Sequence, residues 1–167
     1  MIKALLATVM LASNVGLDWL NSQFGTYDKM QKDLHELAEP GYMEYKSAEL
    51  IIKHLEEHGF KIERGVANIP TAFVATFGEG KPVMGVLAEY DALPGLSQDT
   101  TPQNRPLVEG GYGHACGHNL IGTTALSAAV AVSKWLAEGH QGTIRLYGCP
   151  AEEGGGGKTY MVREGLF

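Results

Sequence analysis

Two short apolar runs on either side of one long helical pattern restrict the fold of this chain more than any other feature. Residues 82–88 and 143–147 are nearly all apolar, as is typical of strands buried inside a sheet. Between them, residues 122–138 form an alanine-rich pattern that predicts a buried helix, closed by Gly139. This order favours a sheet whose strands are connected by crossover helices.

Weaker patterns add further elements before and after this unit. The remaining predicted elements are helices over 26–38, 47–58 and 158–164 and strands over 60–63 and 72–77. Pro40-Gly41 and Gly59 end the first two helices. The order of helices and strands predicts a three-layer α/β domain with a largely parallel central sheet.

The candidate functional residues follow the two apolar runs. Asp91 comes directly after 82–88, and Glu152 and Glu153 come after 143–147. Residues 91–119 have no regular pattern, and a loop of this length inside a domain is usually functional. Because ligands bind beyond the carboxyl ends of such strands, we expect these carboxylates and the end of the loop at one edge of the sheet.

The end of that loop, Gly113-His114-Ala115-Cys116-Gly117-His118-Asn119, is rich in metal-binding side chains. Thiolate and imidazole both bind zinc-like ions. A structural zinc site would need a second pair of such ligands, so Cys116 and His118 point to a catalytic site with an open position. Two alternatives stay open: Cys116 as a nucleophile with His114 or His118 as its base, and His114 as a third ligand rather than a hydrogen-bonding residue.

The adjacent carboxylates of Glu152 and Glu153 should diverge on a loop. One of them can then hold a metal while the other acts as general base on an activated water. The alternative is an acidic loop that only faces solvent. Asp91 either orients a ligand histidine or forms a turn with its own backbone.

Three other features have structural interpretations. The run Gly157-Lys158-Thr159 is not a phosphate-binding loop, because Glu152 stands where that motif needs glycine. His54 and His58 lie four residues apart, but on a polar helix face, and are expected to be solvated. Cys149 is expected to be buried at a strand end, and two cysteines do not make a disulfide framework.

Charge and hydropathy narrow the partners. The formal net charge is −6 with dispersed Lys and Arg, which argues against nucleic acid or an anionic membrane as partner. Residues 1–16 carry one Lys before a short apolar run and are either signal-like or a short amphipathic helix. Cytoplasmic and periplasmic or secreted locations therefore both stay open. The run is too short to span a membrane, and no other segment is expected to do so.

Three motifs occur in a familiar order: Glu89-Tyr90-Asp91-Ala92-Leu93-Pro94, His114-Ala115-Cys116-Gly117-His118-Asn119 and Gly148-Cys149-Pro150-Ala151-Glu152-Glu153-Gly154-Gly155. Together with residues 33–45, they resemble the dinuclear metallopeptidase and amidohydrolase family that includes aminoacylases, carboxypeptidase G and the plant auxin–amino-acid conjugate hydrolases. The resemblance covers about residues 27–167.

The resemblance implies a three-layer α/β/α catalytic domain of the zinc-exopeptidase type. It implies hydrolysis of the amide bond of a small N-acyl amino acid or dipeptide-like substrate, with an aminobenzoyl-glutamate type as one candidate. Cys116, His118 and Glu153 would be metal ligands, Glu152 the general base, and Asp91 the carboxylate that supports the site. The metals would be two zinc or manganese ions, with no organic cofactor.

Length is where the chain departs from the family. Members are much longer, with further histidine ligands and a lid domain that often mediates dimerisation. Residues 17–167 are therefore expected to be the N-terminal part of a catalytic domain, truncated before the lid, which supplies only part of the ligands. A non-catalytic, metal-binding fragment is the alternative to an active hydrolase.

Overall fold

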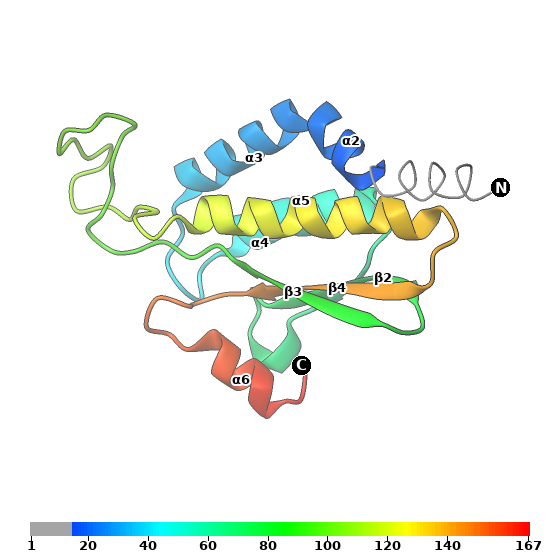
Figure 1. The fold of residues 1–167 in the computed structure, drawn as a ribbon. Helices are drawn as coiled ribbons and strands as arrows, with labels where there is room; N and C mark the ends of the chain where they lie inside the picture. The colour runs from blue at the N-terminus through cyan, green and yellow to red at the C-terminus, as the bar shows by residue number, and fades with distance from the viewer. Residues whose placement is uncertain (1–14) are drawn as a thin grey trace.

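The computed structural model describes residues 15–167, which form a four-stranded sheet with helices on both faces (Figure 1). Most of the signal-like segment predicted over 1–16 lies outside these residues. The helices are α2 (Val15–Ser22), α3 (Phe24–Leu37), α4 (Tyr45–Glu57), α5 (His118–Ala137) and α6 (Gly157–Arg163), with a 3-10 turn at Val66–Asn68. The strands are β1 (Lys61–Arg64), β2 (Phe73–Glu79), β3 (Val83–Glu89) and β4 (Gly142–Cys149).

The layers are the predicted ones. Helices α2 to α5 lie on one face of the sheet, and α6 and the 3-10 turn lie on the other (Figure 1). The main core lies between α3, α4, α5 and the sheet and includes the fully buried Ile51, Leu126 and Leu146. A smaller cluster of Val74, Tyr147 and Met161 packs under α6. The three-layer α/β/α arrangement is therefore confirmed.

The prediction of a largely parallel sheet was wrong. The strand order is β1-β2-β4-β3, and only β3 and β4 run parallel, while β1–β2 and β2–β4 are antiparallel. Periodicity indicates that a segment is a strand but not which neighbour it pairs with. The parallel pair is the one joined by the α5 crossover, and it is the pair that carries the site.

Strand β3 is also less buried than predicted. It lies at the edge of the sheet, and the side chains of Val83, Met84 and Leu87 are exposed. Within the described residues, its outer edge pairs with no other strand. An apolar strand is buried on both faces only when its neighbours and both covering layers are present, and here β4 is the only neighbour.

Helix α5 begins at His118, four residues before the predicted start, and this difference matters for the site. Gly122 lets the first turn approach the end of β3, because a Cβ at this position would lie 2.7 Å from the carbonyl oxygen of Glu89. By length and hydropathy α5 could cross a membrane, contrary to expectation. Half of its most apolar window is buried inside the domain, as in the core helix of a globular fold.

The remaining boundaries differ from prediction by a few residues, and α2 was missed. The long loop after β3 has no helix or named strand, as predicted, but it folds back on itself. Leu93 and Gly113 exchange two backbone hydrogen bonds of 3.0 Å. This pairing returns the chain to the end of β3 and brings Cys116 and His118 close to Asp91.

Candidate metal centre

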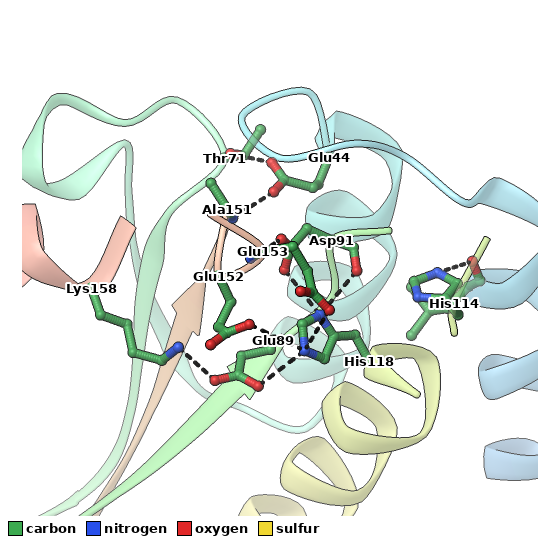
Figure 2. A network of polar contacts seen from close by, with 11 residues as sticks. Glu44, Thr71, Glu89, Asp91, His114, His118, Ala151, Glu152, Glu153 and Lys158 are labelled. Atoms are coloured by element: carbon green, nitrogen blue, oxygen red, sulfur yellow. Dashed lines mark hydrogen bonds and ion pairs between the residues drawn. The ribbon is translucent and has the colours of Figure 1, made fainter. Parts of the chain in front are cut away.

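His118 is the centre of the site (Figure 2). It is the first residue of α5 and is 1% exposed. Its Nδ1 lies 3.0 Å from Oδ1 of the buried Asp91 and 2.9 Å from the Asp91 carbonyl oxygen. Both partners are acceptors, so Nδ1 must carry the proton and donate it. The lone pair of His118 therefore lies on Nε2, and Asp91 has the orienting role that was one of its two predicted interpretations.

The free Nε2 faces carboxylates. Oε2 of Glu89 lies 3.3 Å away, Oε2 of Glu152 3.8 Å, and Oε1 of Glu153 3.9 Å. A lone pair that faces several carboxylate oxygens needs a proton or a metal cation between them. Burial lowers the pKa of His118, but the hydrogen bond and charge of Asp91 outweigh it, so the pKa lies above its ordinary value.

Cys116, His118 and Glu153 offer three ligand atoms that all lie within 4.8 Å of one another. Around a zinc ion with bonds of about 2.0–2.3 Å, ligand atoms are about 3.3–3.8 Å apart, so small side-chain shifts would close the set. Oε1 of Glu153 is buried and has no hydrogen-bond partner. Such an orphaned oxygen fits a cation, so the residues present fit the metal that the sequence predicted.

The expectation that Glu152 and Glu153 diverge was wrong. Both carboxylates come within 4 Å of the same His118 nitrogen. The backbone bends sharply here, with Ala151 at φ 54° and Gly154 at φ 83°, and the Gly154 N–H donates to the Glu152 carbonyl at 2.7 Å. The Glu153 N–H also donates to Oδ2 of Asp91 at 2.8 Å, which ties this turn to the orienting carboxylate.

The electrostatics at Cys116 do not suit a nucleophile. A hydrogen bond to Glu153, and then burial and the nearby carboxylates of Glu152 and Glu89, raise the pKa of the Cys116 thiol. Nucleophilic cysteines have a lowered pKa and sit near positive charge. A divalent cation would displace the thiol proton and remove this penalty, which favours Cys116 as a ligand.

Glu44 is a functional residue that sequence analysis did not single out. Its fully buried carboxylate accepts hydrogen bonds from the Ala151 N–H at 2.8 Å and from the Thr71 hydroxyl at 2.9 Å (Figure 2). Burial raises its pKa, although these hydrogen bonds act in the opposite direction. Glu44 thus anchors the turn before the Glu pair, and the Tyr42 hydroxyl supports the same turn by donating to the Gly155 carbonyl at 2.6 Å.

Glu89 and Lys158 were also missed as site residues. Glu89 ends β3, and its Oε1 lies 2.5 Å from Nζ of Lys158, at the start of α6. A signal for Glu89 was present, because it follows an apolar strand just as Asp91 does. Lys158 was considered only as part of a phosphate loop, and its carboxylate partner supports rejecting that loop.

The other histidines lie elsewhere. Nε2 of His114 donates to the Leu34 carbonyl oxygen at 3.0 Å, so this ring packs against α3 (Figure 2). His54 and His58 are not solvated as predicted but half-buried. Nε2 of His54 lies 3.2 Å from the Tyr27 hydroxyl, and Nδ1 of His58 lies 3.1 Å from Nζ of Lys134.

Comparison with known proteins agrees with this geometry. Residues 85–167 match the model of the peptidase family M20/M25/M40. The chain is 52% identical over 143 residues to one of the two p-aminobenzoyl-glutamate hydrolase subunits of Escherichia coli (strain K12), covering 84% of this chain and 30% of that protein. These matches place the chain in the peptidase family M20/M25/M40. The family prediction from the three motifs is confirmed.

Further relatives share the fold and the partial coverage. The chain is 34% identical over 144 residues to hippurate hydrolase of Campylobacter jejuni, covering 86% of this chain and 36% of that enzyme. The crystal structure of Bacillus subtilis YXEP, described as a dinuclear metal binding peptidase of the M20 family, superimposes with a TM-score of 0.75 at 29% identity. That match covers 87% of this chain and 40% of YXEP, so the chain spans well under half the length of these relatives.

Proposed function

We propose that this chain supplies part of the active site of a metal-dependent amidohydrolase that cleaves the amide bond of small N-acyl amino acids. The observation that carries the proposal is the convergence of Cys116, His118 and Glu153 beside Glu152, with the buried Glu153 oxygen left without a partner. The relatives named for aminobenzoyl-glutamate and hippurate hydrolysis make these two compounds the first substrates to test.

Cys116, His118 and Glu153 would hold a divalent cation, zinc or manganese, of the pair that the YXEP description indicates for that protein. A bound cation would polarise the amide carbonyl and lower the pKa of water. Asp91 keeps the proton on Nδ1 of His118, so that Nε2 stays available as a ligand atom.

Glu152 is the residue suited to move protons. Its side chain is 39% exposed, whereas that of Glu153 is 20% exposed, so Glu152 faces the side from which water and substrate enter. Its carboxylate would accept the proton of the attacking water as the new C–O bond forms. It would then deliver that proton to the amide nitrogen as the C–N bond breaks.

A graft tests this proposal. The segment of the E. coli relative that aligns with this chain is replaced by this chain, and release of p-aminobenzoate is measured. We expect turnover that EDTA abolishes. Glu152→Gln should lose about 10²–10⁴-fold in kcat and keep its metal, while Cys116→Ser should lose metal. A Cys116→Ser graft with normal metal content and turnover would contradict the ligand assignment.

The same graft separates the alternatives. Activity that survives chelation but is lost on alkylation with iodoacetamide would support a cysteine nucleophile instead. An inactive graft with normal metal content would support the non-catalytic alternative. Measuring bound metal on the 167-residue chain alone then shows how much of the site these residues complete, and dimerisation belongs to the same experiment as a sedimentation measurement.

A further inference from the structure

Glu89 has no role in the proposed function so far, yet its carboxylate is the one nearest to the ligand nitrogen of His118. Its Oε2 lies 3.3 Å from Nε2, closer than Oε1 of Glu153 at 3.9 Å. The Glu89 side chain is 20% exposed, as is that of Glu153. By position alone, Glu89 therefore has as strong a claim to the cation as the residue that the sequence motif suggests.

The contact between Glu89 and His118 requires a positive charge. Nδ1 of His118 donates to Asp91, so Nε2 presents a lone pair to the Glu89 carboxylate unless a proton or a metal lies between them. Two acceptors at 3.3 Å repel each other without such a cation. A cation bound by Nε2 would therefore lie against Oε2 of Glu89 as well.

Lys158 holds the other oxygen of the same carboxylate. Its Nζ lies 2.5 Å from Oε1 of Glu89, so one oxygen is fixed by an ammonium group and the other faces the site (Figure 2). Lys158 follows Gly157, whose Cβ equivalent would lie 2.0 Å from the Pro150 carbonyl oxygen, so the backbone here is tightly constrained. The pair therefore restricts Glu89 to a single orientation, as expected for a ligand that is positioned in advance.

The donor count agrees with this arrangement. Zinc in proteins takes about four donors, and Cys116, His118 and Glu153 supply three. Glu89 would add a fourth from a different strand of the sheet. Because four carboxylates lie close to His118 and only Lys158 pairs with them among the described residues, the site has a large excess of negative charge that a divalent cation would offset.

We propose that Glu89 is a further metal ligand of this site, through Oε2, and that Lys158 is a positioning residue that acts through Glu89. This inference rests on the proposed function, because it adds to the same cation site. It also assigns a purpose to the ion pair between β3 and α6, which a purely structural role would leave as a tie between two elements.

Metal binding by the 167-residue chain tests the inference without any activity measurement. Affinity for Zn²⁺ is measured by competition with a chromophoric chelator, and the coordination of Co²⁺ by its visible absorption. We expect Glu89→Gln to weaken Zn²⁺ binding at least 10-fold and to change the Co²⁺ spectrum. Glu164→Gln, a substitution at an exposed carboxylate paired with Arg163, is the matched control and should change neither.

The variant Lys158→Met tests the positioning role. We expect it to weaken Zn²⁺ binding in the wild-type background and to have no further effect in a Glu89→Gln background. Equal effects in both backgrounds would mean that Lys158 does not act through Glu89. Thermal unfolding in EDTA shows whether each variant folds. If Glu89→Gln does not fold, Glu89→Asp, which keeps the charge but shortens the side chain, takes its place with the same expected loss.

The outcomes separate this inference from the proposed function. If Cys116→Ser and Glu153→Gln weaken Zn²⁺ binding and a folded Glu89 variant binds like wild type with an unchanged Co²⁺ spectrum, only the inference about Glu89 is wrong. If the wild-type chain and all variants bind Zn²⁺ equally weakly, the cation site itself is wrong and the proposed function fails with it.

Discussion

The two ends of α5 place histidines in opposite surroundings. At its N-terminal end, His118 lies among carboxylates, and its pKa is raised. Near its C-terminal end, Lys134 contacts His58 beside His54, where burial first and then neighbouring cationic groups lower the pKa of His54 to about 4. The comparison shows that neighbours, and not residue type, decide what a histidine can do. Acidic neighbours prepare His118 for a cation, while the helix interface keeps His54 neutral.

The largest expected effect comes from removing one histidine at each end. His118→Ala leaves the buried Asp91 carboxylate without its imidazole partner, so the free energy of unfolding should fall by about 3–5 kcal/mol. His54→Ala removes one hydrogen bond, to Tyr27, and part of a packed ring, and should cost about 1–2 kcal/mol. Urea unfolding of both variants in EDTA measures this difference. Equal losses would mean that the two ends are energetically alike.

A second prediction concerns Glu44, a buried carboxylate stabilised by hydrogen-bond donors rather than by a cation. Glu44→Ala leaves the Ala151 N–H and the Thr71 hydroxyl without an acceptor, and should cost about 2–4 kcal/mol. Glu44→Gln keeps an acceptor and removes the buried charge, so it should cost less than about 1 kcal/mol. Urea unfolding compares them, with Thr71→Val as control for one bond. A Gln variant as unstable as the Ala variant would show that the charge itself is required.

The pH dependence at His54 gives a third test. Its folded pKa of about 4 lies below the ordinary value of 6.5, so the unfolded chain takes up a proton first as pH falls. The contribution to stability is therefore complete above pH 6.5 and is lost between 6.5 and about 4. Because the ring is partly exposed to solvent, we discount the loss to about 1–2 kcal/mol.

His58, Lys134, Glu57 and Tyr27 face this ring, and the first two act in the same direction as burial. An NMR titration of the His54 ring should give a midpoint near 4. In His54→Gln the fall of stability across this range should become shallower. A midpoint at or above the ordinary value would contradict the description of this end as a neutral packing site.

The smallest effect is expected at exposed charges. Arg64 pairs with Glu49 and Glu56 on the surface, with Arg64 46% exposed, so Arg64→Ala should cost at most about 1 kcal/mol. The cost should shrink further in about 1 M NaCl, where the Debye length is about 3 Å. Thermal unfolding at two salt concentrations measures it. A loss as large as that of His118→Ala would mean that exposure does not separate the two kinds of ion pair.

The sequence predicted more of the site than of the sheet. Every predicted helix and strand exists, because apolar spacing reports which face of an element is buried. Asp91, Cys116, His118 and the Glu pair meet at one edge because they follow the two strands that are parallel. Strand direction in the rest of the sheet could not be predicted, because antiparallel pairing of β2 with β4 depends on long-range contacts.

Local patterns also could not show how side chains meet. His54 and His58 lie on a helix face that reads as polar, yet α2, α3 and α5 cover it, and α2 itself has too weak a pattern to be predicted. Glu44 is in a turn between two helices, where a buried carboxylate has no sequence signature. The convergence of Glu152 and Glu153 depends on the left-handed Ala151, a conformation that alanine rarely adopts.

The exposed edge of β3 also affects how this polypeptide behaves in concentrated solution. Val83, Met84 and Leu87 present apolar side chains beside backbone amides that pair with no other strand among residues 15–167. Such an edge is a template for adding strands from other molecules. Purified samples should therefore become turbid with rising concentration, and a lysine introduced at Met84 should delay this, so the edge limits the conditions under which the metal site can be studied.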